Sequence, residues 1–220
     1  MNKLLPYILI AIAAVAGLLL NQYLNPSEKQ ANSAVADQEN GIRIDNRFET
    51  LLIYPKKNRL PEFQFVNQDK HSFTNENFLE RWNLIFIGYT NCPDVCPNTL
   101  NQMTQLYNSL DVKTQQKFQF ILLSVDPERD TPDHLRNYLD YFHEDFIGVS
   151  GDKTQIDKTV KALGGVYSLN KEEGEFYTVD HSARIFIVGP EARRYGIMES
   201  SSIASSDKST LVKELTLLSM

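Results

Sequence analysis

Apolar residues along this chain gather in two kinds of pattern from about residue 60 onward. Three short runs are apolar at nearly every position, which is typical of strands buried on both faces of a sheet. They are residues 83–89, 119–125 and 184–188. Between and after these runs, apolar residues recur every three or four positions, which predicts amphipathic helices. The alternation predicts an α/β domain with a central mixed sheet and helices on both of its faces.

Turn and cap residues set the bounds of the predicted helices. Pro97 suits the start of one helix, and the pair at 131–132, Thr-Pro, suits the start of the next. A third helix begins at Thr154 and ends at Gly164, which tolerates the backbone of a helix end. A last amphipathic helix has apolar residues at positions 211, 212, 215 and 218.

Shorter patterns complete the predicted domain. Residues 63–73 have phenylalanines on either side of a polar Asn-Gln-Asp-Lys turn, which indicates a β-hairpin. Residues 146–149 suit a short strand, and residues 195–198 suit a strand that pairs with the third buried run. A closing hairpin followed by a helix makes the predicted fold thioredoxin-like.

A separate apolar segment opens the chain. Residues 4–20 contain no charged side chain, and the apolar character resumes at Tyr23 and Leu24. A helix of 17 to 21 such residues would be about 25–32 Å long, close to the thickness of a bilayer core. Lys3 adds positive charge before the run and favours an N-terminus that stays inside. We therefore expect residues 4–24 to be a transmembrane anchor.

A cleaved signal peptide is the alternative interpretation of this segment. An Ala-Val-Ala sequence at 34–36 resembles a cleavage site, but it lies well past the apolar run, which is itself longer than a usual signal core. Residues 25–46 are polar and lack periodicity, so they predict a flexible linker before a domain over residues 47–220. The protein is then expected to cross the bacterial inner membrane once, with its C-terminal domain in the periplasm.

Composition narrows the classes of function. The 220 residues include 22 lysines and arginines against 28 aspartates and glutamates, a net charge of −6. This acidity argues against a nucleic-acid partner, which would normally require a basic surface. A content of 42% hydrophobic and 23% charged residues is typical of a globular protein. With only two cysteines, the chain has no disulfide-rich scaffold.

Both cysteines lie where the first buried strand gives way to a helix, in the segment GYTNCPDVCP at 88–97. Pro97 suits the first helical position, so Cys96 is expected to be the N-cap, with Cys92 in the turn before it. The positive end of the helix is expected to lower the pKa of both thiols. A thiolate is both a nucleophile and a ligand for soft metals.

Three interpretations of this pair are open. A structural disulfide across so short a loop would contribute only about 2 kcal/mol, which is little for a domain with an adequate core of its own. A redox-active dithiol is the second, although the spacing departs from the C-x-x-C of common oxidoreductases. A copper site is the third, because two thiolates suit Cu(I) and an added imidazole also suits Cu(II).

A third copper ligand would have to come from elsewhere in the chain. Among the four histidines, His71 lies in the predicted hairpin turn, and His134 and His143 lie at the ends of an ordinary amphipathic helix. His181 instead lies just before the third buried strand, in TVDHSARIFIV at 178–188. In a thioredoxin-like domain that loop faces the cysteine turn, so His181 is the candidate third ligand.

Three motifs together resemble the Sco/SenC family of membrane-anchored, thioredoxin-fold copper proteins. They are GYTNCPDVCP at 88–97, LLSVDPERDTP at 122–132 and VDHSARIFIVGPE at 179–191, in the family's order. The resemblance covers about residues 60–198. Asn91 departs from the pattern, since many members have histidine before the first cysteine.

The resemblance implies that Cys92, Cys96 and His181 bind copper, as Cu(I), Cu(II) or both. It also implies delivery of copper to the dinuclear copper centre of cytochrome c oxidase subunit II. Other periplasmic copper or thiol-redox proteins are further partners that it suggests. Such a metallochaperone has no turnover of its own, although Cys92 and Cys96 are also candidates for a redox pair acting on the cysteines of that subunit.

Two other classes of function would use the same cysteines. The main alternative is a periplasmic thiol–disulfide oxidoreductase that acts through Cys92 and Cys96 without a metal. A thiol peroxidase has the same fold, but it needs an arginine near its cysteine, and none lies within ten residues of Cys92. Only the copper-binding class needs His181.

The second motif adds one further candidate residue. Asp126 follows the second buried strand and precedes the helix that starts with Thr-Pro. A carboxylate at such a turn commonly caps the helix. The functional alternative is that Asp126 approaches the copper site and supports its ligands.

Overall fold

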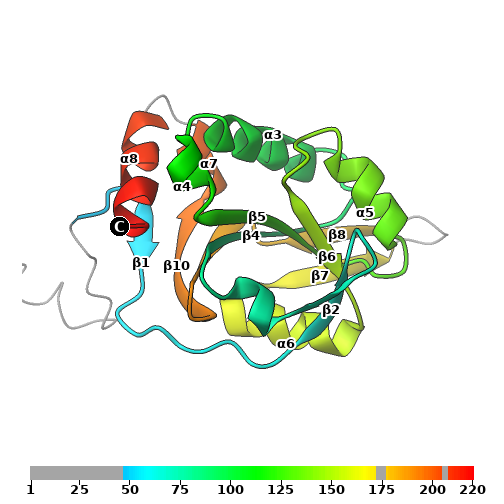
Figure 1. Ribbon diagram of the computed structural model, residues 1–220. Helices are drawn as coiled ribbons and strands as arrows, with labels where there is room; N and C mark the ends of the chain where they lie inside the picture. The colour runs from blue at the N-terminus through cyan, green and yellow to red at the C-terminus, as the bar shows by residue number, and fades with distance from the viewer. Residues whose placement is uncertain (1–46, 172–176, 205–207) are drawn as a thin grey trace, which may run out of the picture. The chain divides into compact units, whose positions relative to one another are not determined.

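A computed structural model describes residues 47–171, 177–204 and 208–220 of the chain (Figure 1). The predicted anchor at 4–24 and the predicted linker at 25–46 lie outside these residues. Within the described part, no helix is both long enough and apolar enough to cross a membrane.

A mixed sheet of eight strands forms the centre of the described domain. From one edge to the other, its strands are β1 (Leu51–Ile53), β10 (Arg193–Glu199), β9 (Arg184–Gly189), β4 (Trp82–Gly88), β5 (Phe118–Ser124), β6 (Ile147–Ser150), β2 (Gln64–Asn67) and β3 (Ser72–Thr74). Strands β4, β5 and β6 run parallel, and all other neighbours pair antiparallel. The predicted buried runs are β4, β5 and β9, and they lie side by side in the middle of the sheet.

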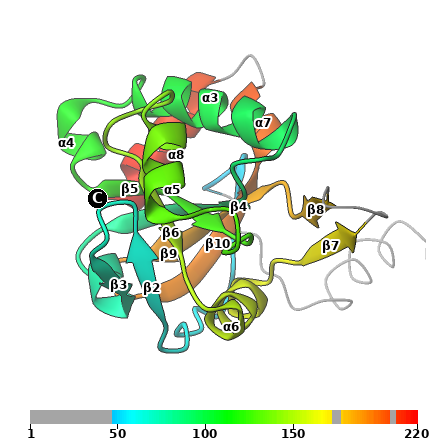
Figure 2. The same ribbon diagram turned by 90° about the vertical axis from the view of Figure 1, so that its right-hand side faces the viewer.

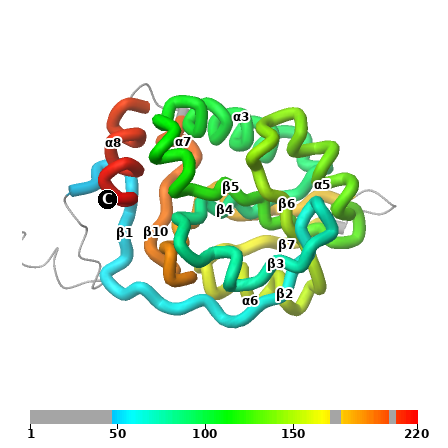
Figure 3. Tube along the Cα trace, viewed as in Figure 1, coloured from blue at the N-terminus to red at the C-terminus, as the bar shows by residue number. Residues whose placement is uncertain are grey.

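Helices cover both faces of this sheet, as predicted (Figures 1 and 2). They are α3 (Val95–Tyr107), α4 (Val112–Gln115), α5 (Pro132–Leu139), α6 (Lys153–Leu163), α7 (Ser200–Ala204) and α8 (Lys208–Leu218), with a 3-10 turn, η1 (Asn75–Phe78). Helix α3 lies above the sheet in Figure 1 and α6 below it. The tube view shows the same arrangement along the chain (Figure 3). The central strands are therefore buried from both sides, which explains why their sequences are apolar throughout.

The predicted cap residues define two of these helices. Thr131 is the N-cap of α5, where its side chain accepts a hydrogen bond from the His134 amide, and Pro132 is the first helical residue. Gly164 ends α6 with a φ of 83°, in the left-handed region that glycine adopts without strain. Helix α6 begins one residue before the predicted Thr154, because Asp152 supplies the capping oxygen.

The predicted start of α3 is wrong. The helix begins at Val95 with Asp94 as its N-cap residue, so Cys96 lies inside the first turn and not at the cap. Pro97 is the third helical residue. The first four amides of a helix have no partner within it, so proline costs no hydrogen bond at any of these positions. Proline therefore indicates the first turn of a helix, but it does not show which position of that turn it occupies.

A two-stranded hairpin, β7 (Tyr167–Lys171) with β8 (Tyr177–His181), was not predicted from the sequence. It forms a second sheet, with Tyr167 opposite His181 in the register. Strand β8 alternates between exposed and less exposed side chains, but only Val179 is fully buried, so its signal is weak beside the continuous buried runs. Short elements such as β1, α4 and α7 also have too few residues to show a period.

Candidate metal centre

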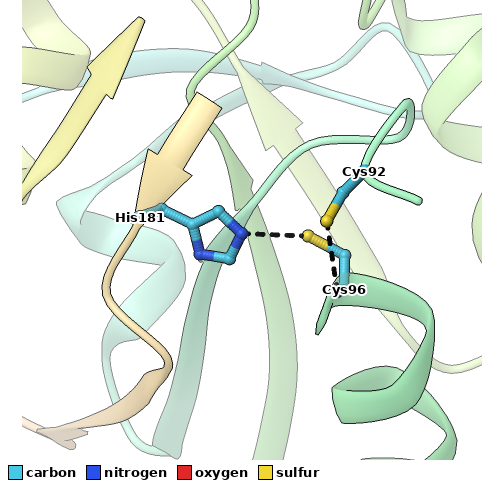
Figure 4. Close-up of side chains that lie close together, drawn as sticks. All are labelled: Cys92, Cys96 and His181. Atoms are coloured by element: carbon cyan, nitrogen blue, oxygen red, sulfur yellow. Dashed lines mark hydrogen bonds between the residues drawn. The ribbon is translucent and has the colours of Figure 1, made fainter. Parts of the chain in front are cut away.

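Two thiols and one imidazole meet above the carboxyl end of β4 (Figure 4). Cys92 lies in the loop after β4, Cys96 lies in the first turn of α3, and His181 is the last residue of β8. Their sulfur and nitrogen atoms all lie within 4.8 Å of one another. The described residues contain no other group of three or more such side chains spaced for a metal ion.

The contacts within this cluster leave its donor atoms pointing at one another. The Nε2 atom of His181 lies 3.2 Å from the Cys96 sulfur, and the Cys92 sulfur accepts the Cys96 amide at 3.4 Å. The Nδ1 atom of His181 lies 3.3 Å from the Ser182 carbonyl oxygen, which can only accept, so Nδ1 carries the proton. The lone pair of Nε2 therefore faces the Cys96 sulfur, as a metal ligand requires.

The two cysteines are free thiols in different surroundings. Cys96 is fully buried, whereas Cys92 is partly exposed. Burial raises the pKa of the Cys96 thiol, since a thiolate is poorly solvated inside the protein. The sequence-based expectation of a lowered thiol pKa is therefore wrong for Cys96. This loss of hydration outweighs the hydrogen bond with the Tyr89 backbone, which favours the thiolate, and the neighbouring Cys92 raises the pKa further.

The imidazole of His181 is held in an aromatic setting. The ring of Phe86 meets it edge-on with centroids 5.6 Å apart, and the ring of Tyr89 does so at 6.1 Å. Burial is the main cause that lowers the pKa of His181 below its ordinary value. The neutral imidazole, which is the form that binds a metal, is thus favoured.

Gly88 makes room for the buried sulfur. It is the last residue of β4, and a Cβ atom at this position would lie 2.8 Å from the Cys96 sulfur. Real Cβ atoms do not approach another heavy atom so closely. Only glycine therefore lets α3 bring Cys96 this close to the strand.

The other three histidines lie outside the cluster. His71 and His134 are exposed, and the Nδ1 atom of His134 lies 2.7 Å from the Arg129 carbonyl oxygen. His143 lies beyond the end of α5, with its ring 4.4 Å from that of Tyr107. Among the described histidines, only His181 joins the cysteines, as its place in the sequence predicted.

Asp126 is buried, and its carboxylate is used neither as a helix cap nor as a direct contact to the cluster. Its two oxygens accept hydrogen bonds from Arg129 Nε and from the Tyr177 hydroxyl, the latter at 2.6 Å. Tyr177 is the first residue of β8, the strand that ends at His181. Nothing in the sequence pattern shows that Arg129 and Tyr177 meet, so neither residue was expected near this carboxylate.

The fold and the cluster together define a class: a thioredoxin-like domain with two cysteines and a histidine arranged as metal ligands. The SCO1/SenC family model matches residues 54–216, which is most of the chain. The chain belongs to this family. The predicted thioredoxin-like α/β fold is thereby confirmed, with solved family members as its structural neighbours.

Individual relatives agree with this assignment. A candidate copper-binding protein of Stutzerimonas stutzeri is 34% identical over 78% of this chain and 79% of its own length. The mitochondrial SCO1 homolog of Homo sapiens is 36% identical, but the match covers 54% of this chain and only 40% of the human protein. The structure of copper-bound ScoI from Bradyrhizobium japonicum matches with a TM-score of 0.65 and 30% identity, covering 72% of this chain and 98% of that one.

Proposed function

We propose that this protein binds one copper ion through Cys92, Cys96 and His181 and acts as a copper-binding assembly factor for cytochrome c oxidase. The observation that supports this most directly is the convergence of the three donor atoms within 4.8 Å. Family membership supports the same function, since the resemblance to the Sco/SenC family implies both copper binding and a part in oxidase assembly.

The donor set fits copper on chemical grounds. Two sulfur ligands suit the soft Cu(I) ion, and the imidazole provides the harder donor that Cu(II) prefers. The neutral His181 ring already presents Nε2 to the sulfurs, so no change of tautomer is needed. Each cysteine must lose a proton before it binds, so copper uptake releases protons.

Delivery to the dinuclear centre of oxidase subunit II is the finer part of the proposal. Cys92 is partly exposed, which gives an acceptor protein access to one of the ligands. Transfer then requires the acceptor's own soft ligands to replace Cys92, Cys96 and His181 in turn. Other periplasmic copper or thiol-redox proteins are possible partners for the same exchange.

The setting of this domain is also part of the proposal. Residues 4–24 would anchor the chain in the bacterial inner membrane, residues 25–46 would form the linker, and residues 47–220 would form the copper-binding domain in the periplasm. Protease added to spheroplasts should then digest the domain and leave a small membrane-bound fragment. A shortened mature protein found in the soluble fraction, and not with the membranes, would contradict the predicted anchor.

A thiol–disulfide oxidoreductase remains the second candidate, because both sulfurs are free and close together. In that reaction Cys92 and Cys96 would give two electrons and two protons to a partner disulfide and become a disulfide themselves. His181 has no necessary part in it. The role of His181 therefore separates the two functions.

The deciding experiment compares His181→Ala with Cys92→Ser, Cys96→Ser and the control His71→Ala. We expect His181→Ala to weaken Cu(I) binding in part and Cu(II) binding more strongly, while dithiol oxidation continues. Either serine variant should abolish both activities, and His71→Ala should change neither. Thiolate-to-Cu(II) absorption and oxidase assembly in cells are the readouts. Full absorption and full assembly in His181→Ala would favour the oxidoreductase.

A further inference from the structure

The loop between β5 and α5, residues 125–131, contacts the segments that carry the candidate ligands. On the cysteine side, buried Asp130 accepts hydrogen bonds from the Thr90 amide at 3.0 Å and the Thr90 hydroxyl at 2.6 Å. Thr90 lies two residues before Cys92. Toward His181, Asp126 accepts a hydrogen bond from the hydroxyl of Tyr177, the first residue of the strand that ends at His181.

Side-chain contacts matter most at the start of β8, the strand that ends at His181. Cys92 and Cys96 follow β4, a central strand of the eight-stranded sheet. Strand β8 instead pairs only with β7 in the described part of the chain. Outside that pairing, the amide of buried Val179 donates a hydrogen bond to the Tyr89 hydroxyl at 3.2 Å, and Tyr177 contacts Asp126 and Arg129. The backbone therefore holds the His181 end of β8, because β9 begins only three residues later, while side-chain contacts hold the other end at Tyr177.

Three side chains form a closed group at the start of β8, which we call the Arg129 clamp: Asp126, Arg129 and Tyr177. The Arg129 guanidinium donates from Nε to Asp126 and from Nη1 to the Tyr177 carbonyl oxygen at 3.2 Å. It also stacks on the Tyr177 ring, with Cζ 3.6 Å from the ring centroid. The Tyr177 hydroxyl closes the group by donating to Asp126 at 2.6 Å.

The clamp also reaches the ring that packs against the histidine. The Arg129 Cζ atom lies 5.6 Å from the centroid of the Tyr89 ring. The Tyr89 ring in turn packs edge-on against the His181 ring, and the Tyr89 hydroxyl accepts a hydrogen bond from the Val179 amide. Charged hydrogen bonds and cation–π stacking at partly buried sites are among the stronger side-chain contacts, so this group resists displacement.

We propose that the Arg129 clamp is a positioning element for His181, which fixes β8 so that Nε2 stays within reach of the two sulfurs. This inference rests on the proposed copper function. None of the clamp's hydrogen bonds goes to Cys92, Cys96 or His181, so the clamp would act on the site only through the place of the imidazole. Their loss should therefore reduce the histidine's share of copper binding and leave the dithiol unchanged.

The first test uses Tyr177→Phe and Arg129→Ala, with the matched controls Tyr141→Phe and Arg136→Ala. Tyr141 is 87% exposed, and Arg136 pairs with Asp69 at the surface. Loss of a partner that orients a ligand typically lowers metal affinity about 10- to 100-fold. We expect about a tenfold loss of Cu(II) affinity and a shifted thiolate-to-Cu(II) band in both clamp variants. Cu(I) affinity should change much less, and the controls should match the parent protein.

A conservative variant and a fold check separate positioning from general damage. Arg129→Lys keeps the charge but lacks the planar fork that holds two acceptors at once, so it should restore the Cu(II) band only in part. Circular dichroism should show a native fold in each variant. If Arg129→Ala does not fold, Tyr177→Phe, which removes a single hydroxyl, still answers the question.

The decisive test is a double-mutant cycle between Arg129→Ala and His181→Ala. If the clamp acts through the imidazole, Arg129→Ala should cause no further loss of copper affinity in the His181→Ala protein. An equal loss with and without His181 would overturn the inference, while leaving the copper site itself in place. A parent protein that binds no copper, or binds it equally well without His181, would instead overturn the proposed function, and the inference with it.

Discussion

Cys92 and Cys96 have the same chemistry but different surroundings. Cys96 is buried against β4, where Gly88 leaves space for its sulfur, while Cys92 remains partly exposed. The sequence predicted these two cysteines and His181 as candidate ligands, because it shows the spacing of the cysteines and the place of His181 just before a buried strand. It did not show the burial of Cys96, since that depends on how α3 packs on the strand.

Gly88→Ala should damage the site without removing any ligand. The new methyl group would lie 2.8 Å from the Cys96 sulfur, so the sulfur must move or the helix must shift. We expect weaker Cu(I) binding and a free energy of unfolding lower by about 1–3 kcal/mol, as for other overpacked cores. Urea denaturation and a copper titration would measure the two effects.

Cys96→Ala provides the control for that experiment. If the clash with the sulfur causes the loss of stability, Gly88→Ala should cost much less in a Cys96→Ala background. An equal cost in both backgrounds would point to Phe86 and Leu122, which lie 3.1 and 3.2 Å from the added atom.

At the scale of elements, the sequence predicted what is buried on two sides. Continuous apolar runs identified β4, β5 and β9, and cap residues identified the start of α5 and the end of α6. The β7–β8 hairpin, which carries His181, was not predicted because its strands are short and Val179 is the only fully buried residue among their described side chains. Contacts between elements, such as Arg129 with Tyr177, leave no periodic signal in either segment.

Helix α8 is tied to the first strand by a single buried carboxylate. Glu214 accepts hydrogen bonds from the amides of Thr50 and Leu51 at 3.2 Å, and also from the Glu49 amide and the Thr50 hydroxyl. Three of these donors are backbone amides just before and at the start of β1, which forms one edge of the sheet, and the fourth is the Thr50 hydroxyl. The contact fixes that edge strand against the last helix.

Glu214→Gln should lower the free energy of unfolding by about 1–3 kcal/mol, because an amide leaves some of these donors unsatisfied. Copper affinity should not change, since all of these partners lie within residues 49–51. Chemical denaturation and copper titration of the same sample would test both statements. Glu199→Gln, at an exposed ion pair with Arg184, is a suitable control and should cost less than about 1 kcal/mol. Equal losses in the two variants would contradict the assigned role of Glu214.

At the scale of the whole domain, the proposed copper binding would compete with disulfide formation for the same two sulfurs. The thiols lie within 4.8 Å of one another, so oxidation needs only a local movement of the loop after β4. A disulfide leaves no thiolate to bind Cu(I). The redox state of the surroundings therefore decides whether the proposed site is able to take up copper.

The oxidised protein should bind Cu(I) poorly, and reduction should restore about one copper per chain, as expected of a single three-ligand site. Metal analysis after gel filtration of reduced and oxidised samples would measure the ratio. A Cys92→Ser, Cys96→Ser double variant serves as the blank. Equal uptake in both redox states would place the copper elsewhere on the protein.

The separate β7–β8 sheet has a consequence for the rate at which copper leaves. Segments without ladder contacts to the main sheet can open by local fluctuation, at a cost well below global unfolding. Opening of the hairpin would move the His181 imidazole away, while Cys92 and Cys96 would stay beside the end of β4 in the main sheet. We expect release to proceed through this two-sulfur state, so that the frequency of hairpin opening, measurable by amide hydrogen exchange in β8, sets the pace of transfer.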